Sequence, residues 1–493
     1  MEYVMVIDVG TTGCKATVFD RSGAVCAQTY EEYPVEGYTG MISPNLVWDS
    51  VCRVIRGCTT VHPSIAAICV TSFGESVVGV NHKGQVLMDS FLYTNDSAAN
   101  QWQILDSRLG SDRIYALTGY ISHSMYTASR LMWIRANEPE QYHAARYFLF
   151  FSSFIAWRLC GTAVAEDTQA ARSMLYDLYT GDWSEEILSA AELDREKLPP
   201  VVQAGDILGT TTPEVNRMLG LAGPAQVVAG GQDQPCVALG LGAVRGGSAA
   251  LGLGTVECLN LVLDRPVQNP GLRSHNFVCS PHVVPGKFVT FAVLYSGGVT
   301  LRDLRSRFYS SEHRQAMEVG GDVYVQMMDE AAAQETSVLM VPHFVGSGTP
   351  ELCTADGGVL HGLRLETTLG QLVRSDLEGL AFDLRRNLDA LEACGLTVGQ
   401  IVAAGGGAKS RKGLEIRSSA LGRPLELPRD IQAGTRGVYL IAAKALGWIT
   451  DPEAAARFPT ETVTSSADLA AMAEKYHRFC RLYTLVHSLD QES

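Results

Sequence analysis

Hydrophobic and polar positions alternate with the spacing of β-strands at the start of the chain. A short apolar run, Val4 to Ile7, precedes the turn-rich segment 8–13, and apolar positions return at 16–19 and again at 24–30. The second break is Asp20-Arg21-Ser22-Gly23. Gly, Asp and Ser at such breaks are typical of tight turns between strands. The first thirty residues are therefore predicted to form a β-hairpin with a further returning strand.

The same reading extends along the chain. An apolar run at 65–70 is typical of a buried strand, and 79–88 has the pattern of a second hairpin around Lys83-Gly84. Helical periodicity prevails over 97–109 and 128–136. The polar, helix-like tail after about Asp451 is expected to pack back on the body.

An internal echo indicates a duplication. When the sequence is shifted by 244 positions, Ile7 to Asp20 lies over Leu251 to Asp264, and five of the fourteen positions carry the same residue. Ordinary composition gives about one such coincidence. The coincident pairs are Gly10 with Gly254, Thr11 with Thr255, Cys14 with Cys258, Val18 with Val262 and Asp20 with Asp264.

Each half also carries a later apolar strand that ends in glycines, at 226–231 and 401–407. Two similar halves predict a duplicated α/β fold with a cleft between the halves. The spacing is too long for a solenoid array. At 493 residues, two or three domains are expected. The predicted division is 1–244, 245–450 and a helical tail, 451–493, with the boundary at the loop Arg245-Gly246-Gly247-Ser248.

Composition and charge exclude several classes of function. The formal net charge of −14 argues against a general nucleic-acid binder. The 12 cysteines form no Cys-x-x-Cys pair and no His-Glu-x-x-His motif occurs, so buried free thiols are expected in place of disulfides or a zinc site. No stretch reaches the roughly 18 apolar residues of a membrane span, and the start lacks a leader pattern, so a cytoplasmic protein without membrane contact is expected.

Candidate chemistry begins with the Gly-Thr loop that follows the first strand. Glycines let the backbone approach an anion, successive amides can cradle phosphate, and Thr hydroxyls add donors. Asp8 at the strand end could serve Mg²⁺, which prefers a few carboxylates together with phosphate oxygens. The alternative is a plain Gly- and Thr-rich turn. The loop, Asp8 to Lys15, is neither a Walker motif nor a Gly-x-Gly-x-x-Gly dinucleotide turn.

Two further glycine segments complement this loop. The echo places Gly252-Leu253-Gly254-Thr255 in a matching position, so both loops could grip one triphosphate. The cluster at 405–407 follows a strand and opens a helix, where small residues let a flat purine lie against the backbone. Close packing of a strand on a helix would require the same small residues.

Asp233 follows the glycine pair of the segment 230–234. At a strand-to-helix turn, an Asp is commonly an N-cap. In a phosphoryl-transfer cleft, a carboxylate is instead needed to accept the proton of the attacking hydroxyl. Both readings stay open from the residues alone.

In this order, the motifs resemble the FGGY family of carbohydrate kinases, of the actin/hexokinase-like superfamily. The resemblance runs from about Val4 to Gly447 and is strongest to the xylulokinases. The segments that carry it are 7–12, 251–255 and 405–410, supported by 126–133, 341–344 and 349–350. It implies two ribonuclease H-like α/β domains, ATP and Mg²⁺ as cofactors, a sugar or polyol as substrate, and a soluble enzyme that could be a homodimer.

The resemblance also implies roles for individual residues. Asp233 would be the catalytic base and would contact the substrate, and Asp8 would serve the metal. Residues expected to bind the nucleotide are Gly10, Thr11, Thr12, Lys15, Gly254, Thr255, Gly297, Gly298, Gly406, Gly407, Ala408 and Lys409. Residues expected to bind the sugar are Gly74, Glu75 and Arg130.

The chain departs from the family pattern at the sugar site. Where xylulokinases read Gly-Gln-Met-His-Gly, this chain reads Ser72-Phe73-Gly74-Glu75-Ser76, and Glu75 falls where a glycerol kinase carries a polyol-binding Glu. Val256, Glu257, Gln232 and Gln234 also depart from the usual residues. A ketose is the expected substrate, with 6-deoxyketoses and polyols such as glycerol or erythritol as alternatives. A non-catalytic actin-like ATP-binding protein and an NAD-dependent dehydrogenase are the more distant ones.

Overall fold

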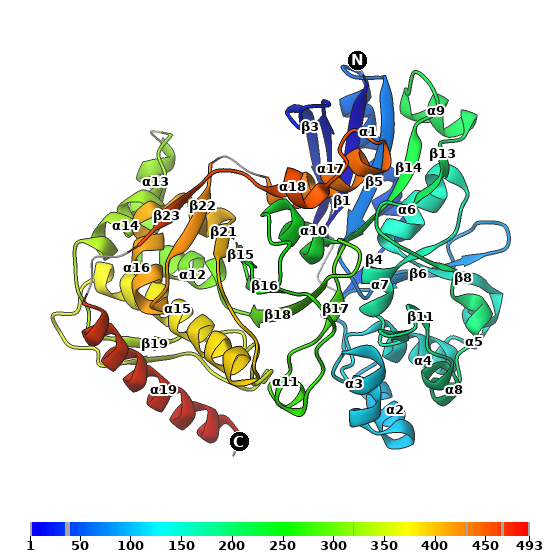
Figure 1. Cartoon of the computed structure of the whole chain (residues 1–493). Coiled ribbons are helices and arrows are strands. Elements are labelled where there is room, and N and C mark those ends of the chain that lie inside the picture. The colour runs from blue at the N-terminus through cyan, green and yellow to red at the C-terminus, as the bar shows by residue number, and fades with distance from the viewer. Residues whose placement is uncertain (1, 35–39, 319, 430–431, 465–467, 492–493) are drawn as a thin grey trace.

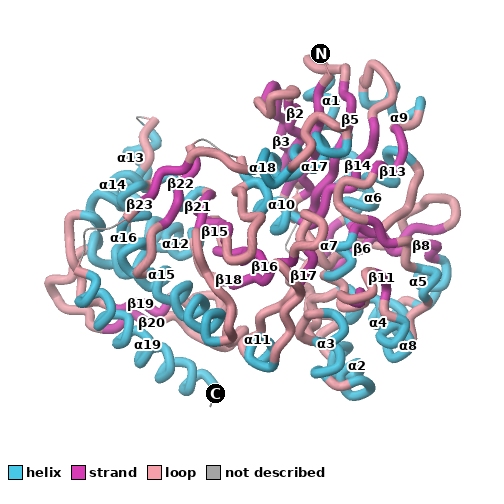
Figure 2. Tube along the Cα trace, in the orientation of Figure 1, coloured by secondary structure: helices cyan, strands magenta, loops and turns pink. Residues whose placement is uncertain are grey.

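Two α/β bodies, each built on one mixed sheet, make up the molecule (Figure 1). The computed structural model describes residues 2–34, 40–318, 320–429, 432–464 and 468–491. Figure 2 shows strands of both sheets in magenta with helices around them. The strands are Tyr3–Val9 (β1), Gly13–Phe19 (β2), Val25–Glu32 (β3), Met41–Ile42 (β4), Ile65–Ser72 (β5), Val77–Asn81 (β6), Ser90–Phe91 (β7), Ala145–Phe150 (β8), Ala165–Glu166 (β9), Tyr176–Asp177 (β10), Asp182–Trp183 (β11), Val201–Val202 (β12), Ile207–Thr210 (β13), Gln226–Gln232 (β14), Ala249–Leu253 (β15), Glu257–Leu263 (β16), Ser280–Pro281 (β17), Phe288–Leu294 (β18), Leu339–Val341 (β19), Val359–His361 (β20), Ile401–Ala404 (β21), Leu425–Pro428 (β22) and Thr460–Val463 (β23).

Helices cover both faces of each sheet and extend beyond the sheet ends. They are Pro44–Thr59 (α1), Gln101–Leu109 (α2), Ser111–Thr118 (α3), Thr127–Asn137 (α4), Pro139–Ala144 (α5), Phe151–Cys160 (α6), Asp167–Ala171 (α7), Glu185–Ala191 (α8), Pro213–Leu219 (α9), Asp233–Gly240 (α10), Pro270–Ser274 (α11), Gly298–Phe308 (α12), Ser310–Glu318 (α13), Val323–Ala332 (α14), Leu369–Ala393 (α15), Arg411–Leu421 (α16), Ala433–Ala445 (α17), Pro452–Ala456 (α18) and Leu469–Gln491 (α19), with the 3₁₀ helices Arg195–Lys197 (η1) and Gly406–Lys409 (η2).

The first sheet runs in the order β13-β14-β5-β1-β2-β3. Strands β1, β2 and β3 are antiparallel, as the alternating pattern predicts, and β1, β5 and β14 are parallel. Because successive side chains of a strand point to opposite faces, Val4 and Val6 face α10 and α17, while Met5 and Ile7 face α1 and α6. Both faces are covered, which explains why β1 is almost continuously apolar.

The second sheet, β17-β18-β16-β15-β21-β22-β23, repeats this topology. Strands β15 and β16 form an antiparallel hairpin, and β15, β21 and β22 are parallel, as β1, β5 and β14 are. Shifting β2 by 244 residues reproduces the bounds of β16. The duplicated α/β fold predicted from the sequence echo is therefore confirmed.

The two glycine-ended strands of the halves are not topological equivalents. Strand β21 lies directly beside β15, so its counterpart in the first sheet is β5. Strand β14 lies one strand further from β1 and corresponds to β22. The Gly405 cluster in the second half therefore occupies the position that the Ser72–Ser76 turn occupies in the first.

The structure differs from the local predictions where a strand pairs with another strand that is distant in the sequence. The segment 79–88 keeps its turn, with Gly84 N–H donating to Asn81 O at 3.0 Å, but its two arms share only the single bridge Val80–Val86. Strand β6 pairs with β8 instead. The tail is not wholly helical, because β23 pairs with β22 and completes the second sheet. Helices α2 and α4 occupy the two predicted helical segments, α2 beginning at Gln101.

Helix α10 lies between the sheets and is joined there by α17. Cys236 and Leu239 of α10 pack on the first sheet, while Ala238 packs on the second. Helix α17 comes from the second half of the sequence but covers the first sheet (Figure 1). The two helices approach closely because both carry glycine at the contact: a Cβ on Gly437 would lie 1.9 Å from Cys236 O.

We expect Gly437→Ala to destabilise the protein by about 2 kcal/mol or more, because overpacking forces the two backbones apart. Gly434→Ala on the same helix is the matched control, since its added Cβ meets Val237 at 3.5 Å, an ordinary contact. The melting temperatures of both variants, compared with that of the unmodified protein, measure the effect. Equal melting temperatures for the two variants would contradict this account of the helix contact.

Candidate active site

The first Gly-Thr loop is a tight turn between β1 and β2, and its Thr residues are accessible. Gly10 N–H donates to Gly13 O at 2.9 Å, which closes the turn. Thr11 is half-buried and Thr12 is exposed, so both are accessible to a ligand. A Cβ on Gly13 would lie 2.5 Å from Glu31 O, so only glycine fits against β3. The loop has the form predicted for a phosphate-binding turn.

Asp8 and Lys15 face each other across this hairpin. They are paired in register, and Lys15 Nζ lies 3.7 Å from Asp8 Oδ2. Burial raises the pKa of Asp8, and the positive charge of Lys15 opposes this shift. A carboxylate at this position, beside a loop predicted to bind phosphate, is suited to a divalent cation.

Asp233 is the first residue of α10, and the cap of that helix is Gln232. The Gln232 side chain accepts from Gln234 N–H at 3.2 Å and also donates to Asp233 Oδ1. The sequence left open whether Asp233 caps the helix. Gln232 therefore takes the capping position, and the Asp233 carboxylate accepts hydrogen bonds from the Gln232 side chain and the Gln234 backbone.

The electrostatic environment of Asp233 connects the two halves of the molecule. Burial, and then the negative charge of Asp8, raise the pKa of Asp233 to about 6, while Arg172 opposes the shift. Burial and the charge of Asp233 in turn raise the pKa of Cys258, on β16, to about 12. Asp233 therefore lies close enough to both hairpins for charge to act between it and groups on each of them.

Glu75 has a backbone conformation that non-glycine residues rarely adopt. Its φ is 65°, in the left-handed region, and its carbonyl oxygen accepts from Thr127 Oγ1 at 2.6 Å. The side chain is 5% exposed and forms an ion pair with Arg172. Such strained residues are held by their surroundings and cluster at ligand sites.

Arg172 is the important residue that the sequence reading missed. It follows the short helix α7, in a run of small residues with no motif to mark it. Its guanidinium carbon lies 5.6 Å from the ring centroid of Tyr126, and burial lowers its pKa while the charge of Asp233 opposes that shift. Gly74 leaves room for it, because a Cβ there would lie 3.2 Å from Arg172 Nε.

A pocket of about 120 Å³ opens beside Arg172. Arg172, Tyr126 and Tyr295 contribute polar groups, and much of the remaining wall is apolar. Residues from both halves line it: Ile121, His123, Met125, Tyr126, Arg172, Asn276, Val278, Phe291, Val293, Tyr295, Thr349 and Leu352. It has the character of a small-molecule site, apolar with a few convergent polar groups.

Arg130 lies behind the Gly74–Ser76 turn, and it is not among the pocket residues. It is 1% exposed and donates to Phe91 O at 3.0 Å and to Ser76 Oγ at 3.3 Å. Burial lowers its pKa to about 10. These contacts support the turn that carries Glu75, so the direct sugar contact expected of Arg130 stays a prediction.

The second Gly-Thr loop joins β15 to β16 and is covered by the start of α12. Gly298 N–H donates to Gly254 O at 2.8 Å. A Cβ on Gly297 would lie 3.0 Å from Thr255 O, which explains the glycine pair at this point. The structure therefore brings together four residues, Gly254, Thr255, Gly297 and Gly298, that the resemblance assigned to the nucleotide.

Glu257, which follows the second Gly-Thr loop, forms a buried ion pair. Arg417 on α16 donates to its two carboxylate oxygens at 2.9 and 2.6 Å. The neighbouring Asp376 has a pKa raised to about 7 by burial, against the effects of Thr300 and Arg417. The pair ties the second loop to the helix that follows the third glycine cluster.

The third cluster forms η2, directly after β21. Gly405 has φ 109°, and a Cβ there would lie 2.6 Å from Leu253 O, so the turn packs closely against β15. Nothing lies within 4 Å of a Cβ on Gly406, so this face is open. Ala408 is buried and Lys409 exposed. The cluster thus combines close packing on one side with an open surface on the other. Its glycines can therefore serve both close packing and the predicted purine surface.

Comparison with known proteins agrees with this arrangement. Residues 3–240 match the model of the FGGY family of carbohydrate kinases, N-terminal domain, and residues 249–446 match its C-terminal domain. The chain is 23% identical to a xylulose kinase of Bacillus subtilis over 495 residues, 99% of this chain and 97% of the relative. It is 26% identical to an L-fuculokinase of Escherichia coli O157:H7 over 470 residues, 92% and 94% of the two chains.

The solved structure of a ligand-bound xylulose kinase from Lactobacillus acidophilus is similar over 100% of both chains, with a TM-score of 0.90 and 22% identity. This likeness establishes the fold of two actin/hexokinase-like domains. Together with the two family models, which cover both halves, it leads to one conclusion: the chain belongs to the FGGY family of carbohydrate kinases.

Proposed function

We propose that this kinase transfers the γ-phosphoryl group of ATP to a primary hydroxyl of a ketose, with Asp233 as the catalytic base. The observation that carries the proposal is the place of Asp233, which begins α10 next to the capping residue Gln232 and lies close enough to Asp8 and Arg172 for their charges to act on its carboxyl. A carboxyl whose pKa is about 6 is mostly ionised at neutral pH and still basic enough to accept a proton.

The chain's own residues supply positioning and charge stabilisation. Phosphoryl transfer depends on in-line alignment and on neutralising phosphate charge. The backbone amides of the loops at Gly10–Thr12 and Gly254–Thr255 would hold the phosphates, and the open face of Gly406 would receive the adenine. Asp233 would orient the sugar hydroxyl and take its proton. Closure of the two halves would exclude water as a competing acceptor.

Asp8 fits a magnesium site. It is an acid whose pKa is raised in the cleft, and its negative charge acts on Asp233, so two carboxylates share this region. Asp8 would hold the ion directly or through a water. Lys15 Nζ lies 3.7 Å from Oδ2 of Asp8, which leaves the other carboxylate oxygen for the ion. When bound, Mg²⁺ supplies positive charge to the phosphate oxygens.

A 6-deoxyketose is the second candidate substrate, and the pocket beside Arg172 favours it. A terminal methyl group is accommodated by apolar walls such as Val278, Phe291 and Val293, whereas a terminal hydroxyl needs a polar partner. The similarity to xylulose kinases supports an ordinary ketose. Glu75 keeps a polyol such as glycerol or erythritol as a third possibility. Membership of a carbohydrate kinase family argues against a non-catalytic ATP-binding protein and a dehydrogenase.

A coupled assay of ADP release over ketoses, 6-deoxyketoses and polyols tests the proposal. Preference for a ketose or 6-deoxyketose, with phosphate recovered on the sugar, supports it. Preference for a polyol would overturn the ketose assignment and leave the kinase intact. ATP turnover that no sugar or polyol accelerates would overturn the whole proposal.

Asp233→Asn keeps the size of the side chain but removes the base. We expect kcat to fall by about two or more orders of magnitude, because general-base catalysis contributes an effect of that size. Binding of a non-hydrolysable ATP analogue, measured by calorimetry, should be nearly unchanged. A variant with near-normal turnover would show that another group accepts the proton.

The pH dependence of kcat/KM should reflect Asp233. Its carboxyl must be deprotonated to act as a base, so we expect kcat/KM to fall as the pH drops below about 6. Arg172→Gln removes a positive charge that holds this pKa down, so the acidic limb should move to higher pH. The ionisation of ATP itself is the same in assays of the two enzymes. If the acidic limb of the kcat/KM profile does not move in Arg172→Gln, the titration belongs to ATP or to another group.

Glu75→Gln should weaken sugar binding more than ATP binding, because it leaves Arg172 without its ionic partner in the pocket wall. We expect the KM for the sugar to rise about tenfold or more, while the KM for ATP stays within about twofold. Glu186→Gln, at an exposed ion pair with Arg113, is the control and should change neither constant. Equal increases in both constants would argue against a role in sugar recognition.

A further inference from the structure

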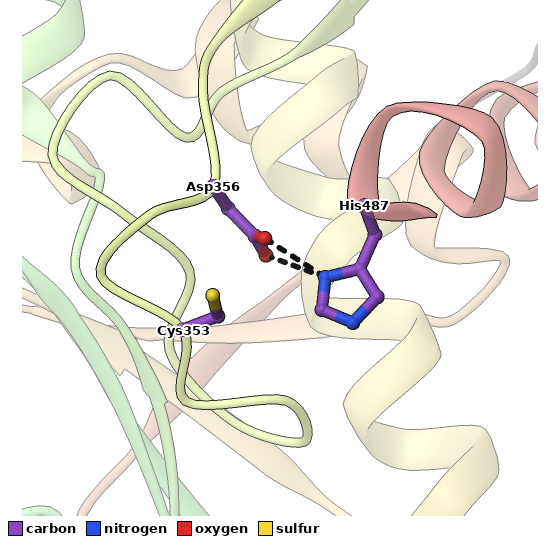
Figure 3. A group of neighbouring side chains, drawn as sticks. All are labelled: Cys353, Asp356 and His487. Carbon is purple, nitrogen blue, oxygen red and sulfur yellow. Dashed lines mark hydrogen bonds and ion pairs between the residues drawn. The ribbon is translucent and has the colours of Figure 1, made fainter. Parts of the chain in front are cut away.

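A second cluster of reactive side chains lies in the second half, where α19 crosses the loop between β19 and β20. It consists of Cys353 and Asp356 from the loop and His487 from α19 (Figure 3). One ligand atom from each residue lies within 4.8 Å of the other two. Among the described residues, no other group of three or more His, Cys, Asp or Glu side chains meets this geometry.

We propose that Cys353, Asp356 and His487 bind a divalent transition-metal ion of the Zn²⁺ type. A thiolate, an imidazole and a carboxylate are the three ligand classes of protein zinc sites. The thiol and the imidazole select against Mg²⁺ and Ca²⁺, which prefer oxygen ligands. Three protein ligands leave a fourth tetrahedral position for water or a further side chain.

The loop holds Cys353 and Asp356 in place before any ion binds. Ser347 N–H donates to Cys353 O at 2.8 Å, and Cys353 N–H donates to Ser347 Oγ at 3.1 Å. Asp356 is 4% exposed, and both of its carboxylate oxygens lie within hydrogen-bond distance of His487 Nδ1. The carboxylate therefore already faces the histidine of the cluster.

Helix α19 presents His487 from a firmly packed face. Tyr476, Phe479 and Tyr483 are buried in a core with α15 and β19, and His487 follows Tyr483 by one helical turn. Tyr483 also donates to Glu351 Oε2 at 2.7 Å, in the same loop. His487 Nδ1 lies 2.8 and 3.0 Å from the two oxygens of Asp356. The helix could not move its histidine away without breaking this core.

A buried histidine borders the cluster without belonging to it. His343 is 3% exposed, its Nε2 lies 3.2 Å from Asp383 Oδ2, and its Nδ1 lies 3.9 Å from Asp356 Oδ2. It is not among the side chains whose ligand atoms lie within 4.8 Å of one another. The fourth position of the proposed site is therefore left to water.

Binding would follow a simple proton balance. The Cys353 thiol loses its proton to solvent and its sulfur binds the ion as thiolate. The proton that His487 Nδ1 shares with Asp356 moves through solvent to Nε2, and the ring then binds the ion through Nδ1. The ion thereby replaces the hydrogen bonds that join His487 to Asp356. It would fasten α19 to a loop whose residues Thr349 and Leu352 line the pocket beside Arg172.

Cobalt titration of the full-length protein tests the site. After treatment with chelator and in excess Mg²⁺, we expect one equivalent of Co²⁺ to give thiolate-to-cobalt charge-transfer absorption that Zn²⁺ abolishes. Magnesium-type oxygen sites, including the one proposed at Asp8, give no such band. Zn²⁺ should also raise the melting temperature of the unmodified protein.

Variants identify the ligands. Cys353→Ser should abolish the charge-transfer band. His487→Ala should weaken Co²⁺ binding by about a hundredfold or more, because loss of a residue that only hydrogen-bonds a metal ligand already weakens metal binding about ten- to a hundredfold. Two matched controls should bind as the unmodified protein does: Cys394→Ser, at another cysteine near a histidine, and His477→Ala, at an exposed histidine of α19. Absence of the band in the unmodified protein, or its survival in Cys353→Ser, would overturn the proposal.

Discussion

The structure depends on the close approach of helix α10 to both sheets and to α17. Gly240 ends α10, and a Cβ there would lie 1.7 Å from Ala433 O, so the helices meet backbone to backbone. The same short helix begins with Asp233. A displacement of α10 against α17 would therefore move the proposed catalytic base relative to both Gly-Thr loops. Packing of small residues at one end of a helix thus fixes the chemistry at the other end.

Charge in the cleft is balanced among few groups. The negative charge of Asp8 disfavours the ionisation of Asp233, and Arg172 favours it while also pairing with Glu75. In a site of low polarity such interactions are stronger than in water. The proposed sugar side and the proposed phosphate side are consequently linked through Arg172, since a change in its pairing with Glu75 alters the basicity of Asp233.

Much of the fold could be predicted from sequence because it rests on local patterns and on repetition. The hairpin at the start, the echo at 254–255 and the glycine segments are all visible in the sequence, and in the structure the loops and glycines lie at or directly after the ends of strands. Arg172 could not be found, since its neighbours in the chain do not mark it and only the fold brings it to Glu75. The pairing of β6 with β8 and of β23 with β22 was missed for a related reason: the partner strands are distant in sequence.

The duplication explains why two unlike ligands could occupy one cleft. Strands β5 and β21 are topological equivalents, each parallel to the first strand of its hairpin, and both end toward the loop of that hairpin. After β5 the chain presents Glu75, a buried acid held in a left-handed turn; after β21 it presents glycines with an open face. An acid can select hydroxyl groups, whereas a bare backbone admits a flat ring. One ancestral strand end, varied in its next few residues, is sufficient to provide both the proposed sugar site and the proposed adenine site.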